Sequence, residues 1–296
     1  MTTLLTGSSG FFGSEYLKLW EHDDIITLGR KNSVINADLS VQVPQIDVVD
    51  MVIHAAGKAH MVPRTDLEKQ EFYNVNVTGT QNLLLALEKA PSLPQYFVFI
   101  SSVAVYGLET GDLIDENAPL LAVTPYGKSK IEAEKLVTNW CNKNNVTCTI
   151  LRIPLLAGKN PPGNLKSMIK GIKAGYYFNI AGGKAKKSMV MAFDVAKIIP
   201  KVAAIGGIYN LTDRHHPSFF ELSTLMAKQL GKKLPLNIPK WVAVLLAKAG
   251  DAIGSKAPIN SDKLNKIISD LTFDDSKAQN KIGWKPGYVL QELEIF

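Results

Sequence analysis

Short apolar runs alternate with longer amphipathic segments over the first half of the chain. The apolar runs predict strands at Thr3–Thr6, Ile25–Leu28, Val34–Ala37, Met51–His54, Tyr96–Ile100 and Cys148–Leu151. The amphipathic segments predict helices at Phe11–Trp20, Asp66–Lys89 and Thr124–Asn144. Continuous apolar strands that alternate with helices indicate a parallel sheet covered on both faces. We therefore expect an α/β fold with a doubly wound parallel sheet.

The pattern changes after Arg152. Prolines and glycines between residues 154 and 163 interrupt the alternation, and the strands that follow are shorter and more isolated. We therefore divide the chain into a sheet domain over residues 1–155 and a smaller, ligand-closing region over 156–189 and 212–296. Residues 190–211 are expected to return one helix, within Val190–Ala204, and one strand, at Gly207–Leu211, to the main sheet.

Composition excludes several classes of protein. Of the 296 residues, 46% are hydrophobic and 20% charged, which permits a sizeable core and excludes wholesale disorder. The apolar runs stay below the roughly 18 residues that span a bilayer, and the first glycine turn comes too early for a signal peptide. The two cysteines, Cys141 and Cys148, form no CxxC pair, so no disulfide scaffold or cysteine zinc site is predicted. We expect a cytoplasmic protein without a transmembrane helix.

Charge is distributed unevenly between the two halves. Residues 1–150 carry 11 Lys and Arg against 17 Asp and Glu, whereas residues 151–296 carry 22 against 10. The positive second half suits an anionic ligand such as a diphosphate, and would also suit acidic phospholipid headgroups or a plain solvated surface. Nucleic acid is not expected as a partner, because the lysines are scattered and no basic, aromatic-laced motif occurs.

A glycine-rich turn follows the first predicted strand and opens the first predicted helix. Glycines there permit a tight turn and a close approach of the backbone to a pyrophosphate, and the helix N-terminus offers unpaired N–H groups to the phosphates. The Gly-Lys-Ser/Thr ending of a nucleotide-hydrolysing loop is absent. The turn favours dinucleotide binding over a turn without a ligand, and the predicted cofactor-binding residues are Gly7, Ser9, Gly10, Phe11, Phe12 and Gly13.

Two cations follow the second predicted strand, which ends Leu28-Gly29-Arg30-Lys31. A carboxylate near this point commonly binds the ribose hydroxyls of NAD, whereas an arginine accommodates the 2′-phosphate of NADP. Here the carboxylate is missing. We therefore expect Arg30 to contact the cofactor, and NADP(H) to be favoured over NAD(H).

A tyrosine and a lysine stand four residues apart, at Tyr126 and Lys130, on one face of the same predicted helix. Just upstream, Ser101-Ser102 ends a buried strand at the carboxyl edge of the sheet, where open α/β folds bind ligands. In this combination Lys130 would lower the pKa of Tyr126, Tyr126 would exchange a proton with a carbinol or carbonyl, and Ser102 would hydrogen-bond the same oxygen. The alternative is structural: a serine that caps a strand end and a tyrosine that packs a helix.

Together these elements resemble the extended short-chain dehydrogenase/reductase family, in its NAD(P)-dependent nucleotide-sugar epimerase, dehydratase and 4-ketoreductase branch, and so imply a Rossmann fold. The motifs that carry the resemblance occur in the family's order: the GxxGxxG turn, Asp38-Leu39, His54-Ala55-Ala56-Gly57, Asn76-Val77-Thr78-Gly79-Thr80, Ser101-Ser102-Val103-Ala104-Val105-Tyr106-Gly107 and the Tyr126/Lys130 pair.

The resemblance also implies roles for these residues. The catalytic residues are Ser102, Tyr126 and Lys130, of which Tyr126 and Lys130 also contact the cofactor. Further cofactor contacts are implied for Asp38 and Leu39 near the adenine, for Asn76 behind the active site, and along the cofactor for His54, Ala55, Ala56 and Gly57. Ser102 and Val103 would lie beside the substrate.

The second half also resembles that family, as the nucleotide-sugar-binding region beside a dinucleotide-binding domain. Asn164 and Leu165 match a segment that contacts the nucleotide diphosphate, and Asn179 matches the strand beside the uracil. Lys187 stands where many relatives carry an arginine that pairs with the diphosphate; lysine keeps the charge but loses the bidentate fork. These four residues are the remaining predicted substrate contacts.

One departure from the family pattern separates its activities. Dehydratases of the family follow the catalytic hydroxyl with Asp-Glu, which supply the acid and base for eliminating water. Here those positions are Val103 and Ala104, which cannot transfer a proton. We therefore expect a UDP-hexose 4-epimerase or a UDP-4-keto-sugar reductase, and the alternative is a non-catalytic dinucleotide-binding redox sensor.

Two other segments have competing interpretations. The adjacent His215 and His216 lack nearby ligands, so a turn is expected there and no metal site. Residues 240–248 have two interpretations. They form either a helix that covers the substrate region or an amphipathic segment that contacts a membrane surface weakly. A homodimer is a further partner interaction that the sequence allows.

Overall fold

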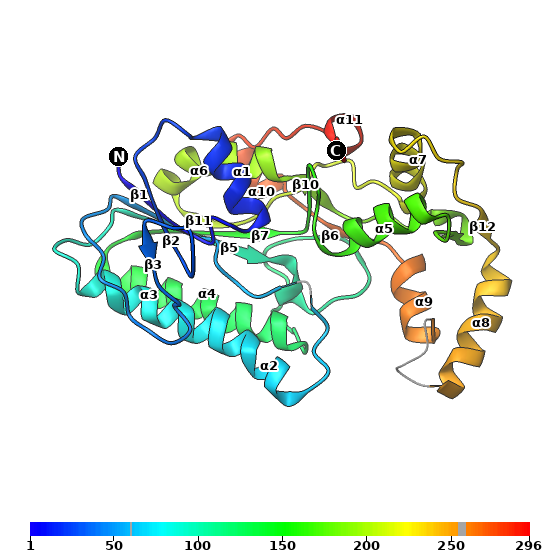
Figure 1. Ribbon diagram of the computed structural model, residues 1–296, viewed down its shortest axis with the longest axis horizontal. Helices are drawn as coiled ribbons and strands as arrows, with labels where there is room; N and C mark the ends of the chain where they lie inside the picture. The colour runs from blue at the N-terminus through cyan, green and yellow to red at the C-terminus, as the bar shows by residue number, and fades with distance from the viewer. Residues whose placement is uncertain (60, 254–258) are drawn as a thin grey trace.

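The computed structural model describes residues 1–59, 61–253 and 259–296 (Figure 1). Its centre is a parallel seven-stranded sheet with the order β11-β7-β5-β4-β1-β2-β3. The strands are β1 (Thr3–Thr6), β2 (Ile25–Gly29), β3 (Ile35–Asn36), β4 (Met51–His54), β5 (Tyr96–Ser102), β7 (Thr147–Ile153) and β11 (Gly207–Asn210). The chain winds outward from β1, first to β3 and then to β11, so the predicted doubly wound fold is confirmed.

Helices cover both faces of this sheet (Figure 1). On one face lie α1 (Phe11–Leu19), α6 (Ala192–Ile205) and α10 (Ser276–Ile282); on the other lie α2 (Asp66–Tyr73), α3 (Gly79–Glu88) and α4 (Pro125–Asn144). Alternate strand residues face the two sides: Leu5 packs towards α1 and α6, whereas its neighbour Leu4 packs towards α3 and α4. Both faces of the central strands β1, β4 and β5 are buried, which explains their continuous apolar runs in the sequence.

The structure differs from the predicted elements in two places. The predicted helix Asp66–Lys89 is interrupted by a π-helical segment, η1 (Asn74–Thr78), in which the Gly79 N–H bonds to the Asn74 carbonyl. Such bulges occur often at functional sites, and this one carries Asn76. In the second half, the residues that begin the predicted helix at Val190 instead form the strand β10 (Met189–Met191), because Met189 pairs with Leu155 of a neighbouring strand.

Within the described residues, three two-stranded parallel sheets lie outside the main sheet, and all are short. They pair β8 (Leu155–Ala157) with β10, β9 (Asn179–Ile180) with β12 (Asn237–Ile238), and β6 (Gly111–Ile114) with β13 (Leu271–Phe273). The remaining helices are α5 (Gly163–Ala174), α7 (Phe219–Gln229), α8 (Lys240–Ile253), α9 (Ser261–Ile268) and α11 (Val289–Glu292), with 3₁₀ turns η2 (Val103–Tyr106) and η3 (Ala181–Gly183).

Part of the second half returns to the main sheet. β11 pairs with β7, and α6 packs on β5 and β7. The division into residues 1–155 and a two-part second region stays a prediction. Among the described residues, no helix combines the length and the apolar character needed to cross a membrane.

Candidate active site

Three of the predicted motifs begin at the same edge of the sheet. Thr6, the last residue of β1, pairs with His54, the last residue of β4, and His54 pairs with Phe99 of β5. β5 continues to Ser102. The glycine turn, the segment after His54 and the serine pair therefore leave neighbouring strands at their carboxyl ends, where doubly wound sheets bind ligands.

The glycine turn is packed so closely that larger residues do not fit. Gly7 has φ +74°, and a Cβ there would lie 2.6 Å from the backbone nitrogen of Ala56. A Cβ on Gly13 would lie 2.3 Å from the carbonyl oxygen of Gly7. Gly10 precedes α1 without a side-chain cap, so the first N–H groups of the helix are open to a ligand. The turn thus fits the pyrophosphate of a dinucleotide.

The other predicted residues of the turn, Ser9, Phe11 and Phe12, differ in how far their side chains are exposed. Ser9 is exposed. Phe11 lies with its ring beside Gly158, whereas Phe12 is buried in the core with Tyr16. Phe12 can therefore contact a cofactor only through its backbone.

His54 is a core residue, although the motif His54-Ala55-Ala56-Gly57 is predicted to lie along the cofactor. Its ring lies between the hydroxyls of Thr6, at 2.7 Å, and Thr80, at 2.9 Å, and stacks on Phe99. Burial and the charge of Lys130 lower its pKa to about 3. His54 is therefore neutral at physiological pH and holds β1, β4 and α3 together, which leaves Ala55, Ala56 and Gly57 to line the edge.

The neutral state of His54 makes the fold sensitive to acid. Between about pH 6.5 and about pH 3 the unfolded chain binds a proton at His54 and the folded chain does not. We expect the free energy of unfolding to fall by about 1.4 kcal/mol per pH unit in this window from this residue. Urea unfolding at several pH values should give a shallower dependence for His54→Asn. The exposed His22→Asn is the control, and equal slopes for native protein and His54→Asn would contradict the assignment.

Asn76 links the segment after β4 to the helix α4. Its side chain accepts from the Lys58 N–H at 2.7 Å and donates to the Lys58 carbonyl at 3.1 Å and to the Ser129 hydroxyl at 2.9 Å. A Cβ on Gly57 would lie 3.2 Å from Asn76 Oδ1 and 3.4 Å from Lys130 Nζ. Asn76, Gly57 and Lys130 are therefore in close contact, and the role of Asn76 behind the active site stays a prediction.

Ser102, Tyr126 and Lys130 come together from β5 and the first turns of α4. Thr124 caps α4 by accepting a hydrogen bond from the Gly127 N–H at 3.1 Å, and Pro125 occupies the first turn, where its missing N–H costs nothing. The Tyr126 hydroxyl hydrogen-bonds the Ser102 side chain. Lys130 Nζ donates to the Ile100 carbonyl at 2.9 Å. The three predicted catalytic side chains thus form one cluster at the end of β5.

The ionisation of this cluster is controlled by burial. Burial raises the pKa of Tyr126, and the hydrogen bond with Ser102 opposes that shift. Burial lowers the pKa of Lys130 to about 8, and the nearby carboxylate of Glu134 opposes it. The sequence predicts that Lys130 lowers the pKa of Tyr126. In the structure, burial and the Ser102 side chain determine this pKa instead. The Lys130 ammonium instead lies 4.5 Å from the centroid of the Phe99 ring.

A buried polar network supports this cluster, and the sequence analysis missed it. Glu134 accepts from the Ser101 hydroxyl at 2.5 Å and pairs with Arg152 at 2.9 Å. Arg152 also donates to the Tyr106 hydroxyl at 3.1 Å, which donates to Asn210 at 2.8 Å. The network links β5, α4, β7 and β11. One signal was present, since Glu134 follows Lys130 by the same four residues that separate Lys130 from Tyr126.

The predicted adenine-side residues lie after β2 and β3. Asp38 is partly buried, and hydrogen bonds from Ser40 lower its pKa, with the charge of Arg30 adding to this effect. Arg30 itself is exposed. Leu39 is buried beside Gly79 at the start of α3. Arg30 and Asp38 thus interact electrostatically, and their contacts with a cofactor stay a prediction.

The predicted substrate residues are more dispersed. Val103 opens η2 and is partly exposed beside Ser102. Asn164 is exposed in the first turn of α5, which has no side-chain cap, whereas Leu165 packs into the core. Asn179 is buried and exchanges hydrogen bonds with Ser223 of α7 at 3.0 and 3.1 Å. Leu165 and Asn179 can therefore meet a ligand only through backbone groups, and their assignment stays a prediction.

The adjacent histidines have separate partners. His215 lies 3.3 Å from a carboxylate oxygen of Glu221, and His216 contacts the Ser188 hydroxyl at 2.9 Å. Over residues 1–59, 61–253 and 259–296, no three His, Cys, Asp or Glu side chains are grouped as a metal site would need.

Comparison with known proteins agrees with this geometry. The family model described as the NAD dependent epimerase/dehydratase family matches residues 3–211. The chain belongs to the NAD-dependent epimerase/dehydratase family. The family predicted from the sequence motifs is therefore confirmed.

Individual members of the family extend the comparison to nearly the full chain. An N-acetyl-alpha-D-glucosaminyl-diphospho-ditrans,octacis-undecaprenol 4-epimerase of Escherichia coli O157:H7 is 30% identical, over 98% of this chain and 92% of that protein. A UDP-glucose 4-epimerase of Vibrio cholerae is 28% identical over the same shares. The structure of MoeE5 in complex with UDP-glucose and NAD has a TM-score of 0.74 at 18% identity, covering 99% of this chain and 96% of that one.

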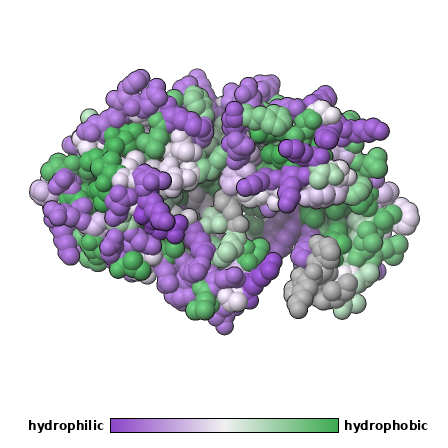
Figure 2. Space-filling view, in the orientation of Figure 1, coloured by the Kyte–Doolittle hydropathy of each residue, from purple (hydrophilic) through white to green (hydrophobic). Residues whose placement is uncertain are grey.

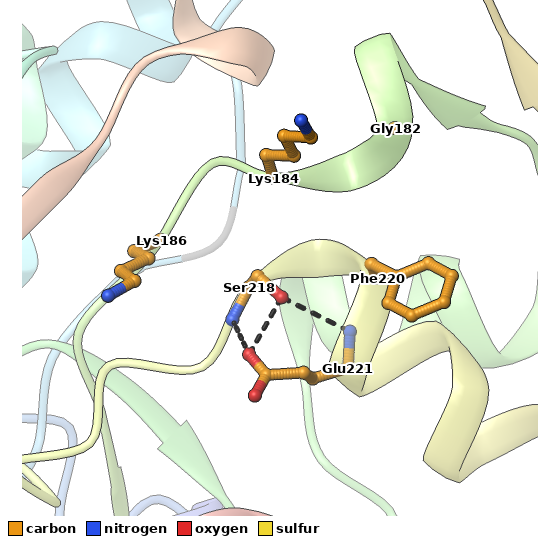
Figure 3. A pocket seen from close by; sticks show the side chains of 6 residues that line it. All are labelled: Gly182, Lys184, Lys186, Ser218, Phe220 and Glu221. Carbon is orange, nitrogen blue, oxygen red and sulfur yellow. Dashed lines mark hydrogen bonds between the residues drawn. The ribbon is translucent and has the colours of Figure 1, made fainter.

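Lys187, which the sequence predicts as a diphosphate contact, has partners within the protein. Its Nζ donates to the carbonyls of Lys266, at 3.0 Å, and Ser269, at 2.9 Å, at the C-terminal end of α9. Nearby, a hollow of about 380 Å³ is lined by Gly182, Lys184, Lys186, Ser218, Phe220 and Glu221 (Figure 3). Figure 3 shows the side chains of Lys184 and Lys186 pointing away from each other. Lys187 thus stabilises α9, and its contact with a diphosphate stays a prediction.

Replacing Lys187 separates these two roles. Lys187→Ala leaves two helix-terminal carbonyls without their cation, which should cost about 1 kcal/mol and lower the melting temperature by about 2–4 °C. If Lys187 also binds a diphosphate, calorimetric titration should show weaker UDP binding and unchanged dinucleotide binding. Lys135→Ala, at an exposed lysine within α4, is the matched control. An unchanged melting temperature would contradict the helix-capping role, and unchanged UDP affinity would assign the diphosphate to Lys184 or Lys186.

Proposed function

We propose that this protein catalyses NAD(P)-dependent oxidation and reduction at C4 of a nucleotide-linked hexose, with a UDP-hexose 4-epimerase as the leading activity. The observation that carries the proposal is the cluster of Ser102, Tyr126 and Lys130 at the end of β5, beside a glycine turn that fits a pyrophosphate. Val103 and Ala104 follow the serine, so the acid and base needed to eliminate water are absent from those positions.

Each residue of the cluster has a distinct task. Tyr126 takes the proton from the C4 hydroxyl during oxidation and returns it during reduction. Ser102, already bonded to the Tyr126 hydroxyl, holds the same C4 oxygen in position. Lys130, which donates to the Ile100 carbonyl in the protein, would donate to the cofactor ribose. When bound, the nicotinamide supplies the hydride acceptor and donor, and the protein's work is to hold it against the sugar.

An epimerase is favoured over a 4-ketoreductase because the two relatives reported above are named 4-epimerases. The ketoreductase remains the alternative that the Arg30-Lys31 pair favours, since a reductase exchanges its cofactor at each turnover and NADPH is the usual donor. A non-catalytic redox sensor is less well supported, because a sensor does not need all three side chains of the cluster.

A sugar carried on a lipid diphosphate is a second candidate substrate. The relative with 30% identity is named for an N-acetylglucosaminyl diphosphate joined to undecaprenol. A diphosphate with an N-acetylhexosamine is common to that substrate and to a UDP-linked one. The cytoplasmic location, the NADP(H) preference and a homodimer remain parts of the proposal.

The decisive experiment identifies the copurifying cofactor and then tests turnover. UDP-glucose and UDP-N-acetylglucosamine are incubated with the protein, and the products are separated by anion-exchange chromatography. Formation of the C4 epimer without added cofactor supports an epimerase, whereas turnover of a 4-keto sugar that requires added NADPH supports the reductase. If neither class of UDP-sugar reacts while the lipid-linked sugar does, the second substrate replaces the first. A protein that binds the cofactor and turns over none of these substrates would refute the proposal.

A further inference from the structure

We propose that the outer face of α8, together with the loop that precedes it, docks on the surface of an anionic lipid bilayer. This docking surface consists of Trp241, Leu245 and Leu246 of α8, Leu234 and Leu236 of the loop, and the lysines between residues 232 and 248.

α8 is apolar on both of its faces. On the inner face, Ala243 and Ala247 are buried against Leu264 of α9. The outer face carries Trp241, which is 68% exposed, and Leu245, which is 60% exposed, with Leu246 beside them. A helix on the surface of a globular protein normally turns charged and polar residues outward. The outward face of α8 is therefore unlike that of an ordinary solvated helix.

The loop before α8 continues the apolar surface. Leu234 is half exposed and Leu236 is 72% exposed. Leu236 lies next to β12, and its carbonyl accepts a hydrogen bond from Asn179 of β9 at 2.9 Å, which fixes the loop to the body of the protein. Figure 2 shows hydrophobic residues gathered at the end of the molecule where α8 and β12 lie. Contiguous apolar surface of this kind marks an interaction site.

The charged residues around the docking surface indicate which kind of partner binds it. Between residues 231 and 253 the chain has four lysines, Lys232, Lys233, Lys240 and Lys248, and all are exposed. The acidic residue in that span, Asp251, is bonded to the backbone and hydroxyl of Ser261. Apolar side chains flanked by lysines, with a tryptophan among them, match the boundary between acyl chains and anionic headgroups.

A second copy of the chain fits this surface less well. In a two-fold symmetric dimer the same patch lies on both sides of the interface, which would bring the lysines of one copy against those of the other. An anionic bilayer instead supplies the opposite charge. The docking surface would then hold the protein where lipid-linked substrates lie, but its binding to lipid does not depend on which substrate the active site uses.

The test is co-sedimentation of the protein with vesicles, which requires no turnover. The native protein should pellet with vesicles of phosphatidylcholine mixed with phosphatidylglycerol, and much less with phosphatidylcholine alone. Trp241→Glu combined with Leu245→Glu should weaken binding on the order of a hundredfold, since two exposed apolar side chains no longer enter the interface. Lys240→Gln combined with Lys248→Gln should weaken binding to the anionic vesicles by about fivefold per lysine.

A matched control introduces the same charge elsewhere. Leu67 of α2 is exposed and remote in sequence from α8, so Leu67→Glu should bind vesicles like the native protein. Circular dichroism checks that each variant keeps its fold. Failure of the native protein to pellet with anionic vesicles, or equal binding by the α8 variants and Leu67→Glu, would overturn the proposal. A native dimer that the α8 variants convert to monomers would assign the surface to a second copy instead.

Discussion

The Tyr126→Phe enzyme is expected to lose on the order of 10²–10⁴-fold in turnover while it keeps its fold and its cofactor. The substitution removes one hydroxyl, which hydrogen-bonds Ser102 and is the proposed proton donor and acceptor. The ring itself stays in contact with Phe72, whose centroid is 6.1 Å from that of Tyr126. The packing of α2 against α4 is therefore retained, and only the proton transfer is lost.

The measurement compares kcat for C4 conversion by the native enzyme and the variant, with the cofactor content determined from absorbance. Tyr288→Phe, which removes the hydroxyl of a tyrosine exposed far along the chain, is the control and should be as active as the native protein. Near-native turnover by Tyr126→Phe would show that Tyr126 is not the acid–base group. An equal loss in both variants would indicate a general effect of handling or folding.

The features that the sequence predicted best are those whose cause is local. The glycine turn is one, since Gly7 needs a positive φ and Gly13 must lie against the Gly7 carbonyl. Both requirements act within seven residues. The spacing of Tyr126 and Lys130 is another, because any helix places residues four apart on one face.

The features that the sequence could not predict depend on which strands become neighbours. The network of Glu134, Arg152, Tyr106 and Asn210 exists only because β5, β7 and β11 are adjacent in the sheet. A sequence motif also cannot tell a side chain that lines a site from one that supports it. His54 belongs to a cofactor motif, yet its ring is buried between two threonines.

The same limit applies to Lys187. Its place in the chain resembles that of a diphosphate-binding arginine, and the charge is preserved. The structure adds a competing partner, the C-terminal carbonyls of α9, which lie 79 and 82 residues farther along the chain. No local pattern around Lys187 could have indicated that contact.

Cofactor preference is the second effect expected to be large. Arg30 and Lys31 follow β2 at the point where a dinucleotide-binding sheet meets the adenosine ribose, and both are exposed. Charge-assisted hydrogen bonds to the 2′-phosphate of NADP contribute about 1.5–3 kcal/mol, or roughly ten- to a hundredfold in affinity. We therefore expect the native protein to bind NADP(H) more tightly than NAD(H) by about that factor.

Arg30→Asp should invert this order, because it removes the guanidinium fork and places a carboxylate where it repels the phosphate and can bind the ribose hydroxyls. Dissociation constants of both cofactors are measured for the native protein, for Arg30→Asp and for Arg64→Asp, an exposed arginine that serves as the control. The charge of Arg30 also acts on the carboxylate of Asp38. Arg30→Asp therefore adds a second negative charge near Asp38, and the loss of affinity should fall on NADP(H). Native binding of NAD as tight as that of NADP would refute the preference and favour an epimerase that retains NAD.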